Sequence, residues 1–131
     1  MLALNLWAAW IGIGLGLITG VGQGLFFHRD DWMGGYGSWR RRLIRLGHIS
    51  FFGLALINLA FVFTVDRMSG LADAAWPGTI VLASYLFVAG AALMPTVCYL
   101  SAWRQGWRRL FFLPVGCLLT AVSSLLIEGL S

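Results

Sequence analysis

Four long apolar runs constrain the fold of this chain more than any other feature. They cover residues 2–27, 43–65, 79–103 and 110–127. At a rise of about 1.5 Å per residue, each is long enough to cross about 30 Å of hydrocarbon as an α-helix. The chain is 60% hydrophobic and 11% charged, far more apolar than a soluble domain. The sequence therefore predicts an all-α fold: a single integral membrane domain, residues 1–131, whose four transmembrane helices form a bundle with short loops.

Glycine recurs at every fourth position of the first run, at Gly12, Gly16, Gly20 and Gly24. Residues four apart lie on one face of a helix, so these glycines predict a groove without side chains. In a membrane such a groove favours close packing against another helix, whereas in water each glycine would cost about 1 kcal/mol relative to alanine. The pattern predicts that the first helix has a packing partner, either another membrane subunit or a second copy of the chain.

A second stripe of small residues lies in the fourth run, at Gly116, Thr120 and Ser124. Its four-residue spacing again places the small side chains on one helix face. We therefore expect a second surface for close helix packing, and one arrangement places it opposite the glycines of the first run.

All basic side chains are arginines, and they give the chain a formal net charge of +4. Eight of the nine flank or fill the segments that follow the first and third runs. These are Arg29, Arg40, Arg41, Arg42, Arg45, Arg104, Arg108 and Arg109. The positive-inside rule predicts that both segments are cytoplasmic in a bacterial-type inner membrane, with both termini outside. Topology thus accounts for the basic charge, and we expect no nucleic-acid partner.

The segment after the first run, residues 28–42, reads HRDDWMGGYGSWRRR. Three aromatic residues among glycines are followed by three arginines: Trp32, Tyr36, Trp39, Arg40, Arg41 and Arg42. Aromatic rings suit the headgroup level of a membrane, and arginines attract anionic headgroups. The composition predicts an interfacial loop that anchors the chain. The alternative is that this loop forms a docking surface for a partner subunit.

The two histidines offer a cofactor hypothesis, because His28 and His48 are both expected on the cytoplasmic side. Neutral imidazoles on neighbouring helices can supply the two axial ligands of a b-type haem, as in membrane cytochromes. Their levels differ by more than one helical turn, so the haem would tilt or the first helix would extend. Without haem, we expect His48 to hydrogen-bond across helices and His28 to cap the first helix or contact headgroups.

A mixed metal site is the other possible use of the histidines, with His28, Asp30, Asp31 and His48 as ligands. Nitrogen and oxygen ligands would suit zinc, iron or manganese. The spacing is not specific, however, and the two aspartates have nearby arginines as partners, so we expect no metal site. A quinone pocket near His48 and Arg45 has no specific sequence signal.

Three further residues are expected to have structural roles. Asn58 lies deep in the second run, where an amide predicts a hydrogen bond between helices. Cys98 and Cys117 lie within predicted helices and outside any C-x-x-C pattern, which indicates reduced thiols that pack.

No catalytic set is recognisable in the sequence. The chain resembles the small multidrug transporters in length and helix number, but those proteins rely on a carboxylate embedded in the membrane. The first run has none. The glycine groove and the second stripe favour a non-catalytic structural or assembly subunit of a larger membrane complex. The alternative function is electron transfer by a haem bound to His28 and His48.

Overall fold

The computed structural model describes residues 1–69 and 76–130, and every regular element in them is helical. The elements are α1 (Leu2–Phe26), η1 (Trp32–Gly34), α2 (Trp39–Ser69), α3 (Gly78–Trp103), η2 (Gln105–Phe111) and α4 (Phe112–Leu130), where η denotes a 3-10 helix. Four segments in this part of the chain are long and apolar enough to cross a membrane, with η2 leading directly into α4. The all-helical prediction is confirmed, and the four candidate spans indicate a multi-pass membrane protein.

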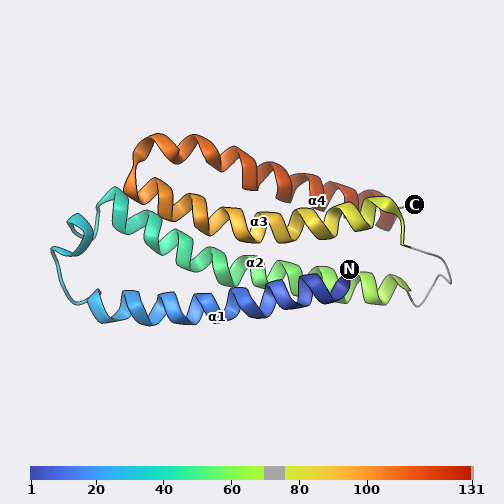
Figure 1. The fold of residues 1–131 in the computed structure, drawn as a ribbon, viewed down its shortest axis with the longest axis horizontal. Helices are drawn as coiled ribbons and strands as arrows, with labels where there is room; N and C mark the ends of the chain where they lie inside the picture. Colours follow the sequence, from blue (N-terminus) through green and yellow to red (C-terminus); the bar gives the residue numbers. More distant parts are fainter. Residues whose placement is uncertain (70–75, 131) are drawn as a thin grey trace.

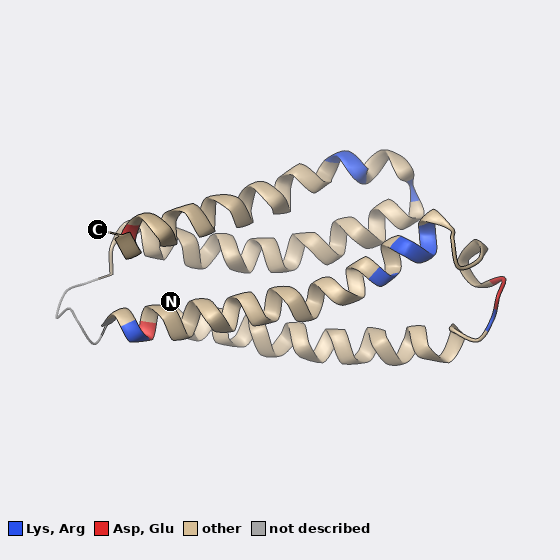
Figure 2. Ribbon diagram, turned by 180° about the vertical axis from the view of Figure 1, so that it is seen from behind, with Lys and Arg blue, Asp and Glu red and all other residues tan. Residues whose placement is uncertain are grey.

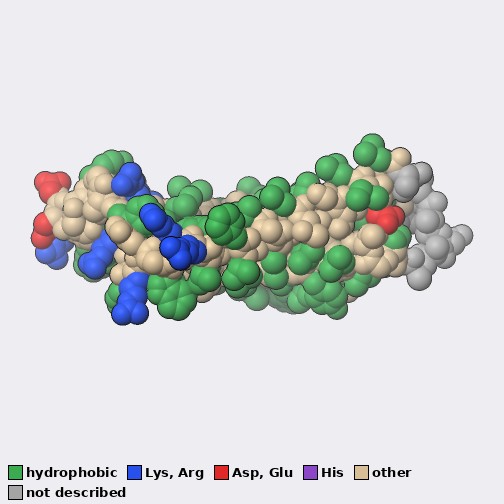
Figure 3. Space-filling view, turned by 90° about the horizontal axis from the view of Figure 1, so that it is seen from above, with side chains coloured by type: hydrophobic (Ala, Val, Ile, Leu, Met, Phe, Trp, Pro, Cys, Tyr) green, Lys and Arg blue, Asp and Glu red, His purple; other side chains and the backbone are tan. Residues whose placement is uncertain are grey.

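Successive helices are neighbours in the bundle, so that α2 packs on α1 and α3, and α3 packs on α4. Helices α1 and α4 lie at opposite edges (Figure 1). Eight of the nine arginines lie where α1 ends, α2 begins and α3 meets η2 (Figure 2). We call this the arginine-rich end. Viewed from above, arginine side chains project from it, whereas hydrophobic side chains cover the length of the helices (Figure 3).

Helix α2 begins at Trp39, earlier than the apolar run at 43–65 indicated. Ser38 caps it, because the Ser38 Oγ accepts a hydrogen bond from the backbone N–H of Arg41 at 3.1 Å. Arg40, Arg41 and Arg42 therefore belong to the first turn of α2 and not to the preceding loop. The prediction placed this boundary too late because arginine marks the edge of the hydrocarbon, whereas a capping serine marks the start of the helix.

Three of the four regularly spaced glycines of α1 lie against α2 of the same chain. A Cβ atom built on three of them would come within 3.2 Å of an α2 side chain: Gly12 near Ala55, Gly16 near Phe52 and Gly20 near His48. A Cβ on Gly24 would meet no atom within 4 Å. The groove predicted from the sequence is thus filled within the chain, and its partner helix is α2.

The spacing of buried residues explains why Gly24 leaves the contact. The buried residues of α1 are Asn5, Ala9, Gly16 and Gln23. Asn5 lies four residues before Ala9, and Ala9, Gly16 and Gln23 follow a seven-residue repeat. Such a repeat stays in line with a neighbouring helix, whereas residues four apart advance by about 40° at each step, given about 3.6 residues per turn. The run of glycines therefore turns away from α2 at its end.

The small-residue stripe of α4 does not face the glycines of α1, so that expectation is wrong. Helix α4 packs on α3, and of the stripe only Ser124 is buried, together with Pro114 and Ala121. Thr120 is exposed, and a Cβ on Gly116 would meet no atom within 4 Å. The physical reason is the order of the helices, since α2 covers the glycines of α1 while α4 packs on α3.

A buried polar network joins α1, α2 and α3 near the other end of the bundle. Asn5, Asn58 and Ser84 are all 0% exposed. The Asn5 amide donates to Asn58 Oδ1 at 2.9 Å and to the Ser84 carbonyl at 3.1 Å, and the Ser84 hydroxyl donates to Asn5 Oδ1. The interhelical role expected for Asn58 is confirmed. Asn5 was missed because it lies close to the start of the first run, where a polar residue suits the membrane surface equally well.

We expect Asn5→Leu to lower the free energy of unfolding by about 1–2 kcal/mol, because Asn58 Oδ1 and the Ser84 hydroxyl lose their hydrogen bonds to Asn5. Thr96→Val is the matched control, since the Thr96 hydroxyl bonds only to the Ala92 carbonyl of its own helix. Denaturation in detergent micelles measures both. Equal stability of the two variants would show that the network contributes nothing.

The glycine contact predicts opposite effects at two positions of α1. Gly16→Ala should destabilise the protein by about 1–3 kcal/mol, because the new methyl group would overlap the Phe52 ring. Gly24→Ala should leave stability unchanged or raise it by up to about 1 kcal/mol through helix propensity. The same denaturation assay compares them, and a loss of stability at Gly24 alone would overturn the packing described for α1.

Candidate functional site

The arginine-rich end is built around Arg41, whose side chain is only 2% exposed. Its guanidinium donates to the Phe27 carbonyl at 3.0 Å through Nη2 and to the Arg29 carbonyl at 3.4 Å through Nη1. These carbonyls follow the last turn of α1, where a helix presents partial negative charge. Arg41 of α2 thereby ties down the end of α1.

Three aromatic rings enclose the same guanidinium. Its carbon lies 4.7 Å from the ring centroid of Phe27, 5.1 Å from that of Tyr36 and 5.5 Å from that of Trp32. Cation–π attraction is strongest when the cation is desolvated, as it is here. The segment predicted to be a membrane-anchoring loop is therefore folded around a buried cation. Nothing in the sequence distinguishes Arg41 from its two neighbours.

The third predicted anchor, Trp39, also packs inward. Its indole N–H donates to the Ser101 carbonyl at 3.0 Å, which ties the start of α2 to the end of α3. Arg45 also contacts the loop, with its guanidinium carbon 4.6 Å from the centroid of the Tyr36 ring. Within the described residues, the exposed side chains of Arg40 and Arg42 have no hydrogen bond, ion pair or ring contact. These two cations remain available to a ligand or a membrane.

An unusual backbone path shapes this loop. Met33, Gly34 and Gly35 all have positive φ, at 56°, 84° and 91°. Such a conformation is uncommon for a residue with a side chain, as at Met33. The Ser38 hydroxyl holds this turn by donating to the Met33 carbonyl at 2.6 Å. As a result, the Met33 side chain lies beside the ends of α2 and α3.

A groove of two adjoining cavities lies between α2 and α3 at the arginine-rich end. The cavities have volumes of about 460 and 250 Å³ and share Met33, Arg40, Ala102 and Trp103. The larger one is also lined by polar residues such as Ser38 and Gln105, and the smaller one reaches Ile44 and Tyr99.

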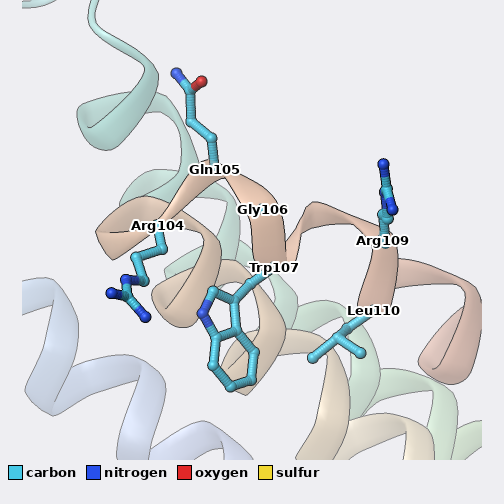
Figure 4. A pocket seen from close by; sticks show the side chains of 6 residues that line it. All are labelled: Arg104, Gln105, Gly106, Trp107, Arg109 and Leu110. Carbon is cyan, nitrogen blue, oxygen red and sulfur yellow. The ribbon is translucent and has the colours of Figure 1, made fainter.

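A larger hollow of about 580 Å³ lies beside η2 and is shallow. It is lined by Arg104, Gln105, Gly106, Trp107, Arg109 and Leu110. The Arg104 and Arg109 side chains point in different directions (Figure 4). They do not converge on one point, so this hollow offers no paired recognition of an anion.

His28 and His48 are not brought together. His28 is exposed beyond the end of α1, whereas the His48 ring lies at the level of Gly20, eight residues earlier on α1, or about 12 Å along the axis. Both ring nitrogens of His48 lie within 3.7 Å of the Cβ position on Gly20, and Nδ1 is 3.2 Å from the Thr19 hydroxyl. A porphyrin between His48 and a second ligand would have to separate α1 from α2. The geometry therefore does not fit the predicted haem pair.

The mixed metal site is not assembled either. Across residues 1–69 and 76–130, no three side chains of histidine, cysteine, aspartate or glutamate come together to hold an ion. Asp31 pairs instead with Arg29, with 3.6 Å between Oδ1 and Nε. The hydrogen bond of His48 to Thr19 is the interhelical contact that the sequence suggested as its alternative role.

No known protein family, curated protein or solved structure matches this chain. Besides the shallow hollow at η2, two grooves in the described part of the chain remain open, and they are therefore the guide to function. One is the groove between α2 and α3 at the arginine-rich end. The other lies farther along the helices, between α1 and α3.

This second surface is an apolar groove of about 450 Å³, which we call the α1–α3 groove. Its floor is the α2 side chains Phe51 and Ala55. Larger side chains, including Trp7 and Ile11, form its rim on α1, and both are exposed. Small residues form much of the lining: Ala8, Gly12, Ala55, Ala91 and Ala92. Sequence reasoning missed it because its residues come from three helices that no single periodic pattern connects.

We expect Arg41→Gln to lower stability by about 2 kcal/mol or more, because the Phe27 and Arg29 carbonyls lose a charged donor and the rings lose their cation. Backbone amides of residues 28–38 should exchange hydrogen faster than in the parent protein. Arg42→Gln makes the same change in charge at an exposed position and should leave exchange unaffected. Equal protection in both variants would show that the loop does not depend on Arg41.

Proposed function

We propose that this chain is a non-catalytic structural or assembly subunit of a larger membrane complex, and that a transmembrane helix of a partner subunit packs into its α1–α3 groove. The observation that carries this proposal is the small-residue lining of a groove that opens towards the surrounding lipid. Apolar side chains gain little by leaving lipid for another helix, so association in membranes depends on close packing of backbones. Alanine and glycine along both walls allow that approach.

The backbone of α3 adds a polar feature to the same groove. Pro95 lines the groove and has no N–H, so it cannot donate to the Ala91 carbonyl one turn earlier. A carbonyl without its helical donor is costly in hydrocarbon. A partner helix with a hydroxyl or amide side chain at this level would satisfy it. This favours a protein partner over a lipid tail, which has no donor.

The surface used for partners thus differs from the one that the sequence suggested. Gly12, Gly16 and Gly20 of α1 are occupied by α2, and of these only Gly12 also lines the α1–α3 groove. We therefore place the partner beside the glycine stripe, on the face that α1 and α3 share.

The arginine distribution supports an orientation for this subunit. With eight of nine arginines at one end, the positive-inside rule favours that end in the cytoplasm of a bacterial-type inner membrane. Both termini then lie outside, since α1 begins and α4 ends at the opposite end of the bundle (Figure 1).

The decisive substitution fills the groove. Ala92→Leu places a larger side chain at an exposed groove position, whereas Ala60→Leu makes the same change at an exposed position of α2 outside the groove. We expect the parent protein and Ala60→Leu to purify in mild detergent with the same stoichiometric membrane partner. Ala92→Leu should lose this partner while keeping its stability, because only partner contact is blocked.

Two differently tagged copies of the chain, expressed together, separate a partner subunit from self-association. Recovery of both tags in one particle would identify the occupant as a second copy. A parent protein that migrates alone as a monomer would overturn the proposal. Retention of the partner by Ala92→Leu would exclude the α1–α3 groove as its binding surface.

A further inference from the structure

We propose that the groove between α2 and α3 at the arginine-rich end binds one anionic phospholipid, with its phosphate at Arg40 and an acyl chain against Ile44 and Tyr99. This site shares no residue with the α1–α3 groove and does not depend on the proposed partner.

The groove has a polar end and an apolar end. Its larger cavity is lined by Gly34, Ser38 and Gln105, and its smaller cavity by Ile44 and Tyr99. Arg40 and Ile44 are four residues apart, so they lie on one face of α2 about one turn from each other. Polarity therefore falls from the end of the bundle towards the region that the helices span. A phospholipid has the same order of groups.

The α3 wall follows the same pattern. Ala102 and Trp103 lie three and four residues after Tyr99, so all three share one face of the last turns of α3. Ala102 leaves room between the two aromatic residues. Trp103 is 84% exposed, and an indole at this level is suited to the boundary between headgroups and acyl chains. The wall thus fits the upper part of a lipid chain.

Charge indicates which headgroup the groove would accept. The Arg41 guanidinium already binds the carbonyls and aromatic rings around it, and the Arg45 guanidinium lies over the Tyr36 ring. Arg40 lines both cavities and, among the described residues, has no internal partner. A guanidinium offers paired donors to a phosphate, which an uncharged pocket could not match. This complementarity favours an anionic lipid over a zwitterionic one.

The loop that closes the groove is held in place. The Met33 side chain borders both cavities because its backbone adopts a positive φ of 56°. The Ser38 hydroxyl fixes that conformation, and Ser38 also caps α2 two residues before Arg40. The wall, the cap and the cation therefore form one local structure.

The experiment measures lipid retention by the full chain. Native mass spectrometry in mild detergent compares added dioleoyl phosphatidylglycerol with dioleoyl phosphatidylcholine, which has the same acyl chains. We expect one phosphatidylglycerol to be retained in preference to phosphatidylcholine. Arg40→Gln should weaken that binding at least about fivefold, the effect expected for one arginine near an anionic headgroup.

Arg42→Gln is the matched control, because it removes the same charge from the same turn of α2 but lies outside the groove. It should leave lipid affinity unchanged. Both arginines are exposed, so neither substitution disturbs packing. Excess inorganic phosphate should not displace the lipid, because phosphate lacks the acyl chain that the apolar end binds.

Three results would overturn the proposal. Equal weakening by Arg40→Gln and Arg42→Gln would reveal general charge attraction in place of a site. Equal retention of phosphatidylcholine would show that the headgroup charge does not affect binding. Displacement by inorganic phosphate would show that the groove binds a free anion and not a lipid.

Discussion

The close approach of α1 to α2 is the contact on which the rest of the structure depends. The Phe52 and His48 rings of α2 fill the space at Gly16 and Gly20, and at Gly12 the Phe51 carbonyl oxygen comes within 3.2 Å of the Cβ position. Hydrocarbon gives no hydrophobic drive between helices, and such close packing is one of the few ways to gain energy there. The buried Asn5 and Asn58 network then joins this pair to α3.

At the arginine-rich end, the same helix pair is joined by a buried cation. Arg41 lies in the first turn of α2 and donates to carbonyls that follow α1, so the loop between the two helices folds onto it. Carbonyls at Nη1 and Nη2 and three aromatic rings replace most of the water of this guanidinium, while its buried Nε has no partner among the described residues. This arrangement separates three consecutive arginines by role: Arg41 is structural, while Arg40 and Arg42 stay open to the surroundings.

Two open surfaces follow from this architecture, and they lie at different depths. The α1–α3 groove is apolar and lined by small residues, which suits a helix of a partner subunit. The groove beside Arg40 is polar at one end and apolar at the other, which suits a phospholipid. Neither groove is lined by a histidine, because His48 is packed against Gly20 and His28 is exposed beyond α1. Both proposals therefore concern recognition within a membrane.

The sequence by itself determined the helical class, the four candidate spans and the gathering of arginines at one end. These follow from local composition and from the length needed to cross hydrocarbon. Only the tertiary structure decided which helices are neighbours, and hence that α2 covers Gly12, Gly16 and Gly20 of α1 while Gly116 and Thr120 of α4 face away. It also decided that the Arg41 side chain is buried. Local sequence cannot separate it from Arg40 and Arg42, because its burial depends on carbonyls and rings supplied by residues 27–36.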